Sequence, residues 1–250
     1  MLNKQSVDVY DLLFEYVRNL PLAKEDRKRI DFDHMDASWV IDKKFKVSNI
    51  NLRYEPQGDM GRPQNCVIFS STFANSTSSE QVNNLRTEKR TTATCRLQLT
   101  KSVTRNGSIN LQIAPPNTLI QANGGFSKEK ALTSEKEEVL EEEICWSLDT
   151  QVAVQPGHRT KADLVITEGN YKGKFKIDTL FEGIIYIKPR SKKNKPLPFI
   201  TIQNFTDFLK PEKGFHPVPD KPGAVIFTNE GICQCTYGIE QHVELKEELL

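Results

Sequence analysis

The residues that most often carry catalysis or bind metals are scattered through this chain. The four histidines are His34, His158, His216 and His242, and none stands at a catalytic or metal-binding spacing from a cysteine or a carboxylate. No glycine-rich loop separates a strand from a helix, as a phosphate-binding loop would. We therefore predict no enzymatic activity, no catalytic residue, no metal site and no cofactor.

The chain has five cysteines, Cys66, Cys95, Cys145, Cys233 and Cys235. Cys233 and Cys235 form a Cys-x-Cys pair, but no second ligand pair stands at a zinc-binding spacing from them. Residues 1–17 lack the basic segment, apolar run and cleavage site of a secretory signal. We therefore expect five reduced thiols and a protein that is cytoplasmic on synthesis, with non-classical secretion as its route to a target cell membrane.

The stretch with a marked pattern is residues 105–127. Its first arm alternates strictly, which predicts a strand with an apolar face (Ile109, Leu111, Ile113) and a polar face (Ser108, Asn110, Gln112). Pro115 and Pro116 prevent further ladder pairing, so with Asn117 they form the predicted tip of a hairpin. A turn at residues 114–117 gathers the apolar residues of both arms on one side by pairing Ile113 with Thr118, Leu111 with Ile120, and Ile109 with Ala122.

Two interpretations of this hairpin stay open. It is either an ordinary hairpin on a sheet or one that enters lipid, because a strand that spans a bilayer needs about 9–11 residues with alternating apolar and polar sides. In the second case the lipid-facing residues are Ile109, Leu111, Ile113, Ile120 and Ala122. The residues that face the aqueous lumen are Ser108, Asn110, Gln112 and Gln121. Only a closed ring of such hairpins leaves no unpaired backbone edge in lipid.

Composition limits the remaining possibilities. The chain has 250 residues, 37% hydrophobic and 27% charged, with a net charge of +1, which allows one or two domains with a real core. A pI near 7.6 gives no basic excess for a nucleic-acid partner. The basic runs at residues 27–29 and 192–193 are therefore interpreted as solvated surface. No apolar stretch has the length of a transmembrane helix.

Periodicity predicts one helix and many strands. The helix has Ser6 as its cap and ends before Pro21, and residues 24–29 are a charged connector. Residues 134–137 match a capping box that favours a helix, but an even-numbered apolar face favours a strand from about residue 143. The other strands are expected at 45–52, 66–73, 90–99, 161–167, 171–179, 183–188 and 224–243, with a linker at 189–198 and a loop at 204–223. The fold is thus mainly β and elongated.

Several motifs stand in a fixed order around the hairpin. They are Phe73-Ala-Asn75-Ser-Thr77 with Gln81 and Arg90-Thr-Thr before it, Gly124-Gly-Phe126-Ser at its exit, and a run from Trp146 through Val152, Val154 and Pro156 to Thr160 after it. Their order resembles the aerolysin-like β-pore-forming proteins, in the epsilon-toxin/mosquitocidal-toxin branch with its hydralysin-like members. The resemblance covers about residues 69–187.

The resemblance implies an aerolysin-type architecture of long antiparallel strands, an amphipathic insertion hairpin and a short N-terminal helix. It implies a cytolytic protein that binds a target membrane as a soluble monomer, through a lipid, glycan or protein receptor, and forms a homo-oligomer with a transmembrane β-barrel. Residues 1–68, with part of 189–250, are the expected head. Residues 69–188 are the expected pore-forming module, and 189–250 form a linker and C-terminal strands.

Two alternatives remain at this point. One is a non-lytic β-sandwich lectin or lipid-binding protein with the same fold. The other is an intracellular regulatory or storage protein, which five reduced cysteines would suit.

Overall fold

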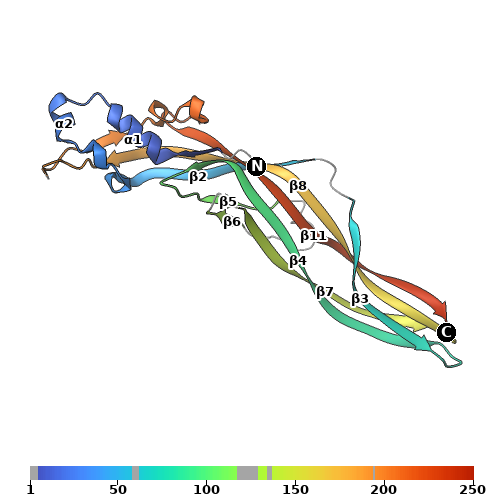
Figure 1. The fold of residues 1–250 in the computed structure, drawn as a ribbon. Coiled ribbons are helices and arrows are strands. Elements are labelled where there is room, and N and C mark those ends of the chain that lie inside the picture. Colours follow the sequence, from blue (N-terminus) through green and yellow to red (C-terminus); the bar gives the residue numbers. More distant parts are fainter. Residues whose placement is uncertain (1–4, 58–61, 117–128, 134–136, 194) are drawn as a thin grey trace.

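The computed structural model describes residues 5–57, 62–116, 129–133, 137–193 and 195–250. The molecule is elongated and mainly β, as the sequence predicts: long strands run along it, and the helices gather at one end (Figure 1). We call the end with the helices the head end. The opposite end carries Leu249 at the end of the last strand and the connection between residues 75 and 81.

The elements follow one another in a simple order. β1 (Gln5–Asp8) leads into α1 (Val9–Asn19), α2 (Lys24–Arg29) and the short 3-10 helices η1 (Phe32–His34) and η2 (Ala37–Trp39). The long strands are β2 (Val40–Pro56), β3 (Gln64–Asn75), β4 (Gln81–Thr104), β7 (Glu138–Val154), β8 (His158–Ile187) and β11 (Val225–Leu249). The short elements are β5 (Leu111–Ile113), β6 (Lys130–Leu132), β9 (Ile200–Ile202), η3 (Phe205–Asp207), η4 (Pro211–Lys213) and β10 (Phe215–Pro217).

One large sheet joins most of these strands in the order β1-β4-β11-β8-β2. β7 also pairs with β4, β9 with β8 and β10 with β11. β8 is long enough to hold two partners on one side, because β2 pairs with its second half and β3 with its first half. All of these pairs are antiparallel except β1 with β4.

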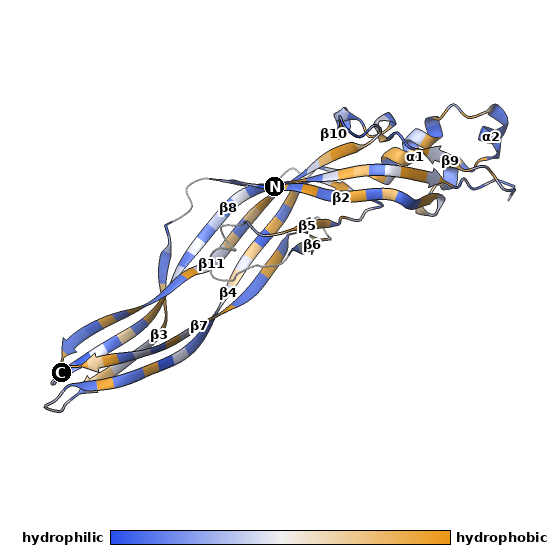
Figure 2. Ribbon diagram, turned by 180° about the vertical axis from the view of Figure 1, so that it is seen from behind, coloured by the Kyte–Doolittle hydropathy of each residue, from blue (hydrophilic) through white to orange (hydrophobic). Residues whose placement is uncertain are grey.

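The apolar residues form three clusters along the sheet. Apolar and polar residues alternate along the long strands, because successive side chains point to opposite faces (Figure 2). The head cluster packs α1, through Val9, Leu13 and Val17, against phenylalanines of β8, η3, β10 and β11. The middle cluster contains residues of β4, β8 and β11, and the third surrounds Val152 and Val154 near the opposite end. β4 and β8 run through all three clusters, and the domain boundaries given above stay a prediction.

Most predicted elements are present, with some corrections. Ser6 is not the helix cap: it lies in β1, and the Asp8 side chain accepts the hydrogen bond from the Tyr10 amide instead (2.8 Å). Residues 24–29 form a helix, with acidic residues in its first turn and basic ones in its last, the order that the helix dipole favours. Residues 138–143 are extended in β7, where Leu140 is buried, so the helical alternative is wrong there.

The strands predicted at 161–167, 171–179 and 183–188 are one strand, β8. The residues between the predicted strands continue the ladder with β11 or β2. Likewise, β11 is a single strand that extends beyond the predicted end at residue 243 to Leu249. Among the described residues, no helix has the length and apolar character needed to span a bilayer.

Candidate membrane-insertion hairpin

The predicted hairpin is present, but its arms pair in a different register. β5 pairs antiparallel with β6, so Leu111 lies opposite Leu132, Gln112 opposite Ala131, and Ile113 opposite Lys130. The predicted pairing of Ile113 with Thr118 and of Leu111 with Ile120 is therefore wrong, because Lys130 and Leu132 hold these pairing positions instead. Asn117, Thr118, Ile120, Gln121 and Ala122 lie outside the described residues.

The first arm has the predicted alternation. Ile109, Leu111 and Ile113 are 5%, 2% and 0% exposed, whereas Ser108, Asn110 and Gln112 are exposed. Pro115 and Pro116, predicted at the tip, are buried, and they line a small pocket with Leu52 and Tyr54 of β2. The assignment of these two faces to lipid and to water stays a prediction.

The large sheet covers the apolar face of the arm. Ile109, Leu111, Ile113 and Leu132 belong to the middle cluster, together with residues of β4, β7, β8 and β11. Burying an aliphatic side chain of this size stabilises the docked position by about 1.5–3 kcal/mol. This burial has a consequence for mutagenesis: an arginine at position 111 would destabilise the folded monomer, so Leu111→Arg cannot report on insertion alone.

Polar contacts fix the outer edge of the arm to β2. The Tyr54 hydroxyl donates a hydrogen bond to the Ala114 carbonyl (2.5 Å), and the Asn49 side-chain amide donates one to the Asn110 carbonyl (2.9 Å). A groove of about 860 Å³, lined by residues 45–52 of β2 and by Ser108, Asn110, Leu111 and Gln112, lies between β2 and the arm. The arm is therefore attached to β2 by few hydrogen bonds and is not paired with it as a strand.

The base of the arm is held by Asp8. β4 ends at Thr104, and a tight turn follows in which Asn106 and Gly107 have positive φ angles of 52° and 73°. The Asp8 carboxylate accepts hydrogen bonds from the Thr104 hydroxyl (2.6 Å) and from the Gly107 (2.7 Å) and Asn106 (3.3 Å) amides. The same carboxylate caps α1, so one side chain joins the helix of the head to the start of the hairpin.

These contacts set the charge of Asp8. Partial burial raises the pKa of its carboxyl, but the hydrogen bonds from Gly107, Thr104, Tyr10 and Asn106 stabilise the carboxylate, and together they lower the pKa below its ordinary value of 3.8. Asp8 is therefore ionised at neutral pH, when its hydrogen bonds to the turn are strongest. Sequence reasoning missed this residue because its partners lie about a hundred positions away.

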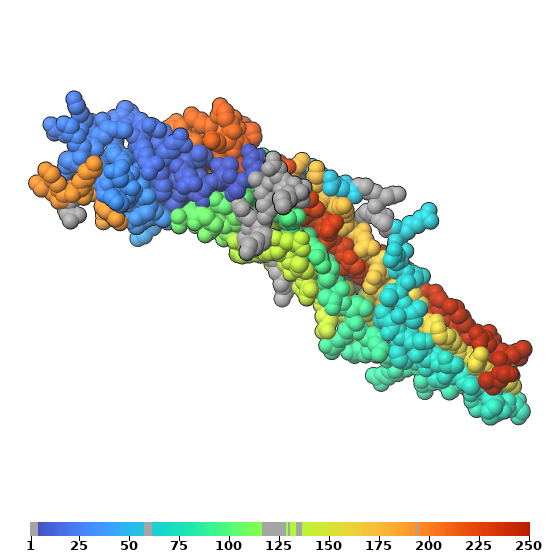
Figure 3. Space-filling view, in the orientation of Figure 1, coloured from blue at the N-terminus to red at the C-terminus, as the bar shows by residue number. Residues whose placement is uncertain are grey.

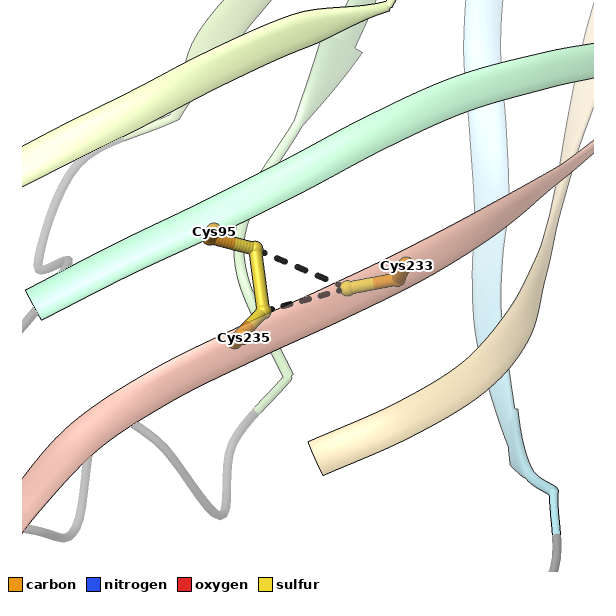
Figure 4. Close-up of side chains that lie close together, drawn as sticks. All are labelled: Cys95, Cys233 and Cys235. Atoms are coloured by element: carbon orange, nitrogen blue, oxygen red, sulfur yellow. Dashed lines mark hydrogen bonds between the residues drawn. A yellow bond between two sulfur atoms is a disulfide. The ribbon is translucent and has the colours of Figure 1, made fainter. Parts of the chain in front are cut away.

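Three cysteines meet beneath the hairpin (Figure 4). Cys95 of β4 lies opposite Cys235 of β11 and forms a disulfide with it, so the expectation of five reduced thiols is wrong. The Cys233 sulfur lies 3.5 Å from that of Cys95 and 3.3 Å from that of Cys235, and burial raises the pKa of the Cys233 thiol to about 12. Three converging sulfurs resemble a metal site, but the disulfide leaves only Cys233 as a free thiol in this cluster.

The histidines do not converge on a site within the described residues. His34 contacts Asp31 (2.9 Å) in the head, and His242 contacts Glu244 (3.6 Å) on β11. His34 and His242 therefore each contact a carboxylate that is two or three residues away in the sequence. His158 lies on β8 and His216 on β10. These contacts are typical of surface histidines.

Similarity to solved structures agrees with this architecture. Neither a protein-family model nor a curated protein sequence matches the chain. The Cry23Aa1–Cry37Aa1 binary complex superposes with a TM-score of 0.64 at 16% identity, over 98% of this chain and 90% of the other. A non-toxic crystal protein from Bacillus thuringiensis superposes at 0.65 and 16% identity, over 96% of each chain. The β-pore-forming protein Mpp75Aa1.1 from Brevibacillus laterosporus superposes at 0.55 and 13% identity, over 97% of this chain and 90% of the other.

The chain has an aerolysin-like fold. These neighbours do not distinguish the epsilon-toxin/mosquitocidal-toxin branch, which stays a prediction. In this aerolysin-like chain the hairpin interrupts one long antiparallel pair, because β4 leads into it and β7 follows it. The pair extends from Gln81 opposite Val154 to Leu97 opposite Glu138. The outer face of the pair is mostly polar and carries exposed ion pairs such as Arg90–Glu143 (3.0 Å).

Proposed function

We propose that the protein is a pore-forming, cytolytic protein that binds a target membrane as a monomer, oligomerises and inserts a β-barrel built from its hairpin and the β4–β7 pair. One observation carries the proposal: an arm with strictly alternating faces is docked on the sheet at the point where β4 and β7 would continue as one hairpin. The apolar face that the sheet covers in the monomer is the face that lipid would cover in the pore.

The proposed transition exchanges one apolar environment for another. The arm would leave the middle cluster and lose its burial against β4 and β8. It would regain that burial in the bilayer, while the polar face with Asn110 and Gln112 would line the lumen. A ring is required because a lone hairpin leaves backbone N–H and C=O groups unsatisfied in lipid.

The experiment that tests this proposal is release of a dye from liposomes and of haemoglobin from red cells. The same samples are run on a gel for heat-resistant oligomers. A pore-forming protein gives dose-dependent release together with a discrete high-mass band. Binding to membranes without release at any dose would contradict the proposal.

A second candidate function is a non-lytic protein of the same fold. It is favoured by one specific finding, the superposition on a crystal protein that is described as non-toxic. In that case the hairpin would stay docked after binding, and the disulfide between β4 and β11 beneath it would be a permanent structural link. Membrane binding without oligomers or leakage would favour this second candidate.

The proposed function also assigns a location and a target. The assembled protein would reside in the membrane of the target cell, after release from the cell that makes it. Homo-oligomerisation and contact with that membrane are its proposed interactions.

A further inference from the structure

Two basic runs that are far apart in the sequence meet at the head end. The Lys192 amide donates a hydrogen bond to the Arg29 carbonyl (2.9 Å), and the Arg29 guanidinium donates one to the Pro196 carbonyl (3.2 Å). Ile30 also forms an isolated β-bridge with Ser191. Figures 1 and 3 show α2 and the segment that follows β8 at the same end of the molecule. Taken separately, each run is an ordinary solvated surface, but the fold joins them into one.

We define the head-end basic surface as the lysines and arginines of α2 and of residues 188–195. These are Lys24, Arg27, Lys28, Arg29, Lys188, Arg190, Lys192, Lys193 and Lys195, all of which are exposed. Residues 188–195 contain no aspartate or glutamate. Such a segment has a positive field that reaches about 8–10 Å into solvent at physiological salt.

The nearby carboxylates neutralise this surface only in part. Asp26 pairs with Arg29 (3.5 Å), and Asp36 pairs with Arg190 (3.7 Å). Asp31 contacts His34, while Glu25 and Asp33 are exposed. Within the described part of the chain, no carboxylate forms an ion pair with any of the six lysines of the head-end basic surface. These lysines are therefore available to an external anion.

An exposed aromatic residue adjoins the surface. Phe199 is 56% exposed, the only aromatic among the large apolar side chains found exposed in the described structure. The next residue, Ile200, pairs with Ile187, and Lys188 follows Ile187, so Phe199 and Lys188 extend from the same end of one antiparallel pair. An apolar ring beside several lysines is the combination that binds an anionic bilayer surface, with the ring among the headgroups and the cations at the phosphates.

We propose that the head-end basic surface, with Phe199, is the membrane-docking site and that its ligand is the anionic headgroup layer of a lipid bilayer. This inference rests on the proposed function and gives it a target chemistry. The surface lies at one end of an elongated molecule, so docking there would hold the strands away from the bilayer plane (Figure 1). Neighbouring copies could then meet along their long sides, as a ring requires.

The test is binding to vesicles, measured by flotation separately from leakage. Vesicles of phosphatidylcholine alone are compared with vesicles that contain phosphatidylserine, at low and physiological salt. We expect binding only to the anionic vesicles, weakening as salt rises. The triple variant Lys192→Ser, Lys193→Ser, Lys195→Ser should bind about a hundredfold more weakly, since each lysine near an anionic surface contributes about fivefold in affinity.

The matched control removes exposed lysines from the middle of β8, in the variant Lys172→Ser, Lys174→Ser. It should lose less than threefold, and Phe199→Ser should weaken binding without changing its salt dependence. Circular dichroism and thermal melts establish that each variant is folded. Equal binding to neutral and anionic vesicles, or equal loss in the control and the triple variant, would overturn the proposal.

Two further outcomes separate this inference from the proposed function. If the protein binds anionic vesicles through these lysines but releases no dye, the docking site stands and pore formation fails. If it binds immobilised heparin but not anionic vesicles, the partner is a sulfated glycan and the lipid proposal is wrong.

Discussion

Removing the Tyr54 hydroxyl should speed the release of the hairpin. In Tyr54→Phe the ring keeps its contacts with Phe175 and Tyr171, whose ring centroids lie 6.3 Å and 6.5 Å away. The variant loses only the hydrogen bond to the Ala114 carbonyl. Such a bond contributes a net of about 1 kcal/mol, and Ala114 is only half-buried, so water can satisfy its carbonyl after the change.

The expected acceleration depends on the stage of insertion at which the hydrogen bond between Tyr54 and Ala114 breaks. If the arm has left β2 in the transition state for insertion, about 1 kcal/mol lost from the docked state accelerates leakage about fivefold. The initial rate of dye release at a fixed protein concentration measures this. Hydrogen exchange at the amides of residues 109–113 gives a second measurement that needs no membrane, and it should show faster opening of the arm.

Tyr171, whose ring contacts that of Tyr54, provides the control. The Tyr171 hydroxyl is buried and has no hydrogen-bond partner in the described structure, so Tyr171→Phe removes a hydroxyl of the same kind without breaking a contact to the arm. We expect it to leak at the parental rate with equal or higher thermal stability. If Tyr54→Phe also leaks at the parental rate while its arm exchanges faster, release of the arm does not limit insertion. Equal acceleration in both variants would show that the effect is not specific to the hairpin.

Three further predictions concern the same region. Because the pKa of Asp8 is lower in the folded protein than its ordinary value of 3.8, its contribution to stability is complete above that pH and is lost as pH falls through the depressed value; denaturant melts of Asp8→Asn should therefore lack part of the parental loss below about pH 4. Replacing both Cys95 and Cys235 by serine opens a loop with a sequence separation of 140 residues and should lower the free energy of unfolding by about 2–5 kcal/mol, whereas an unchanged melt would mean that the disulfide does not constrain the unfolded chain. Gln112→Lys should fold normally and shift the conductance in planar bilayers toward anions, because position 112 is exposed in the monomer and faces the proposed lumen; unchanged selectivity of an active variant would contradict that facing.

The features predicted well from the sequence are those that depend on local pattern. Alternation alone placed Ile109, Leu111 and Ile113 on one buried face, because a strand has only two faces. The mainly-β class followed in the same way from many short alternating runs. The register of the hairpin was not predictable by this route, since a Pro-Pro pair shows where pairing stops but not where the chain returns.

The features that were missed depend on long-range proximity. Asp8 holds a turn near residue 106, and Cys95 meets Cys235 only because β4 and β11 are neighbours in the sheet. For the same reason, each of the two basic runs was interpreted by itself as solvated surface. Periodicity carries no information about partners that are distant in the sequence. The contacts of Asp8 with the turn, the disulfide and the head-end basic surface could therefore not be predicted without the order of the strands.

The position of β11 determines when this protein can fold during its synthesis. β11 is made after β4 and β8, yet it lies between them in the sheet and pairs with both. Until β11 leaves the ribosome, the edges of β4 and β8 that it will join stay unpaired and exposed. The sheet must therefore close after translation of the strand, at the slow rates typical of non-local β pairing, about milliseconds to seconds. A nascent chain stalled before residue 225 would be a target for chaperones, and a premature stop there would yield an aggregating fragment without a folded head.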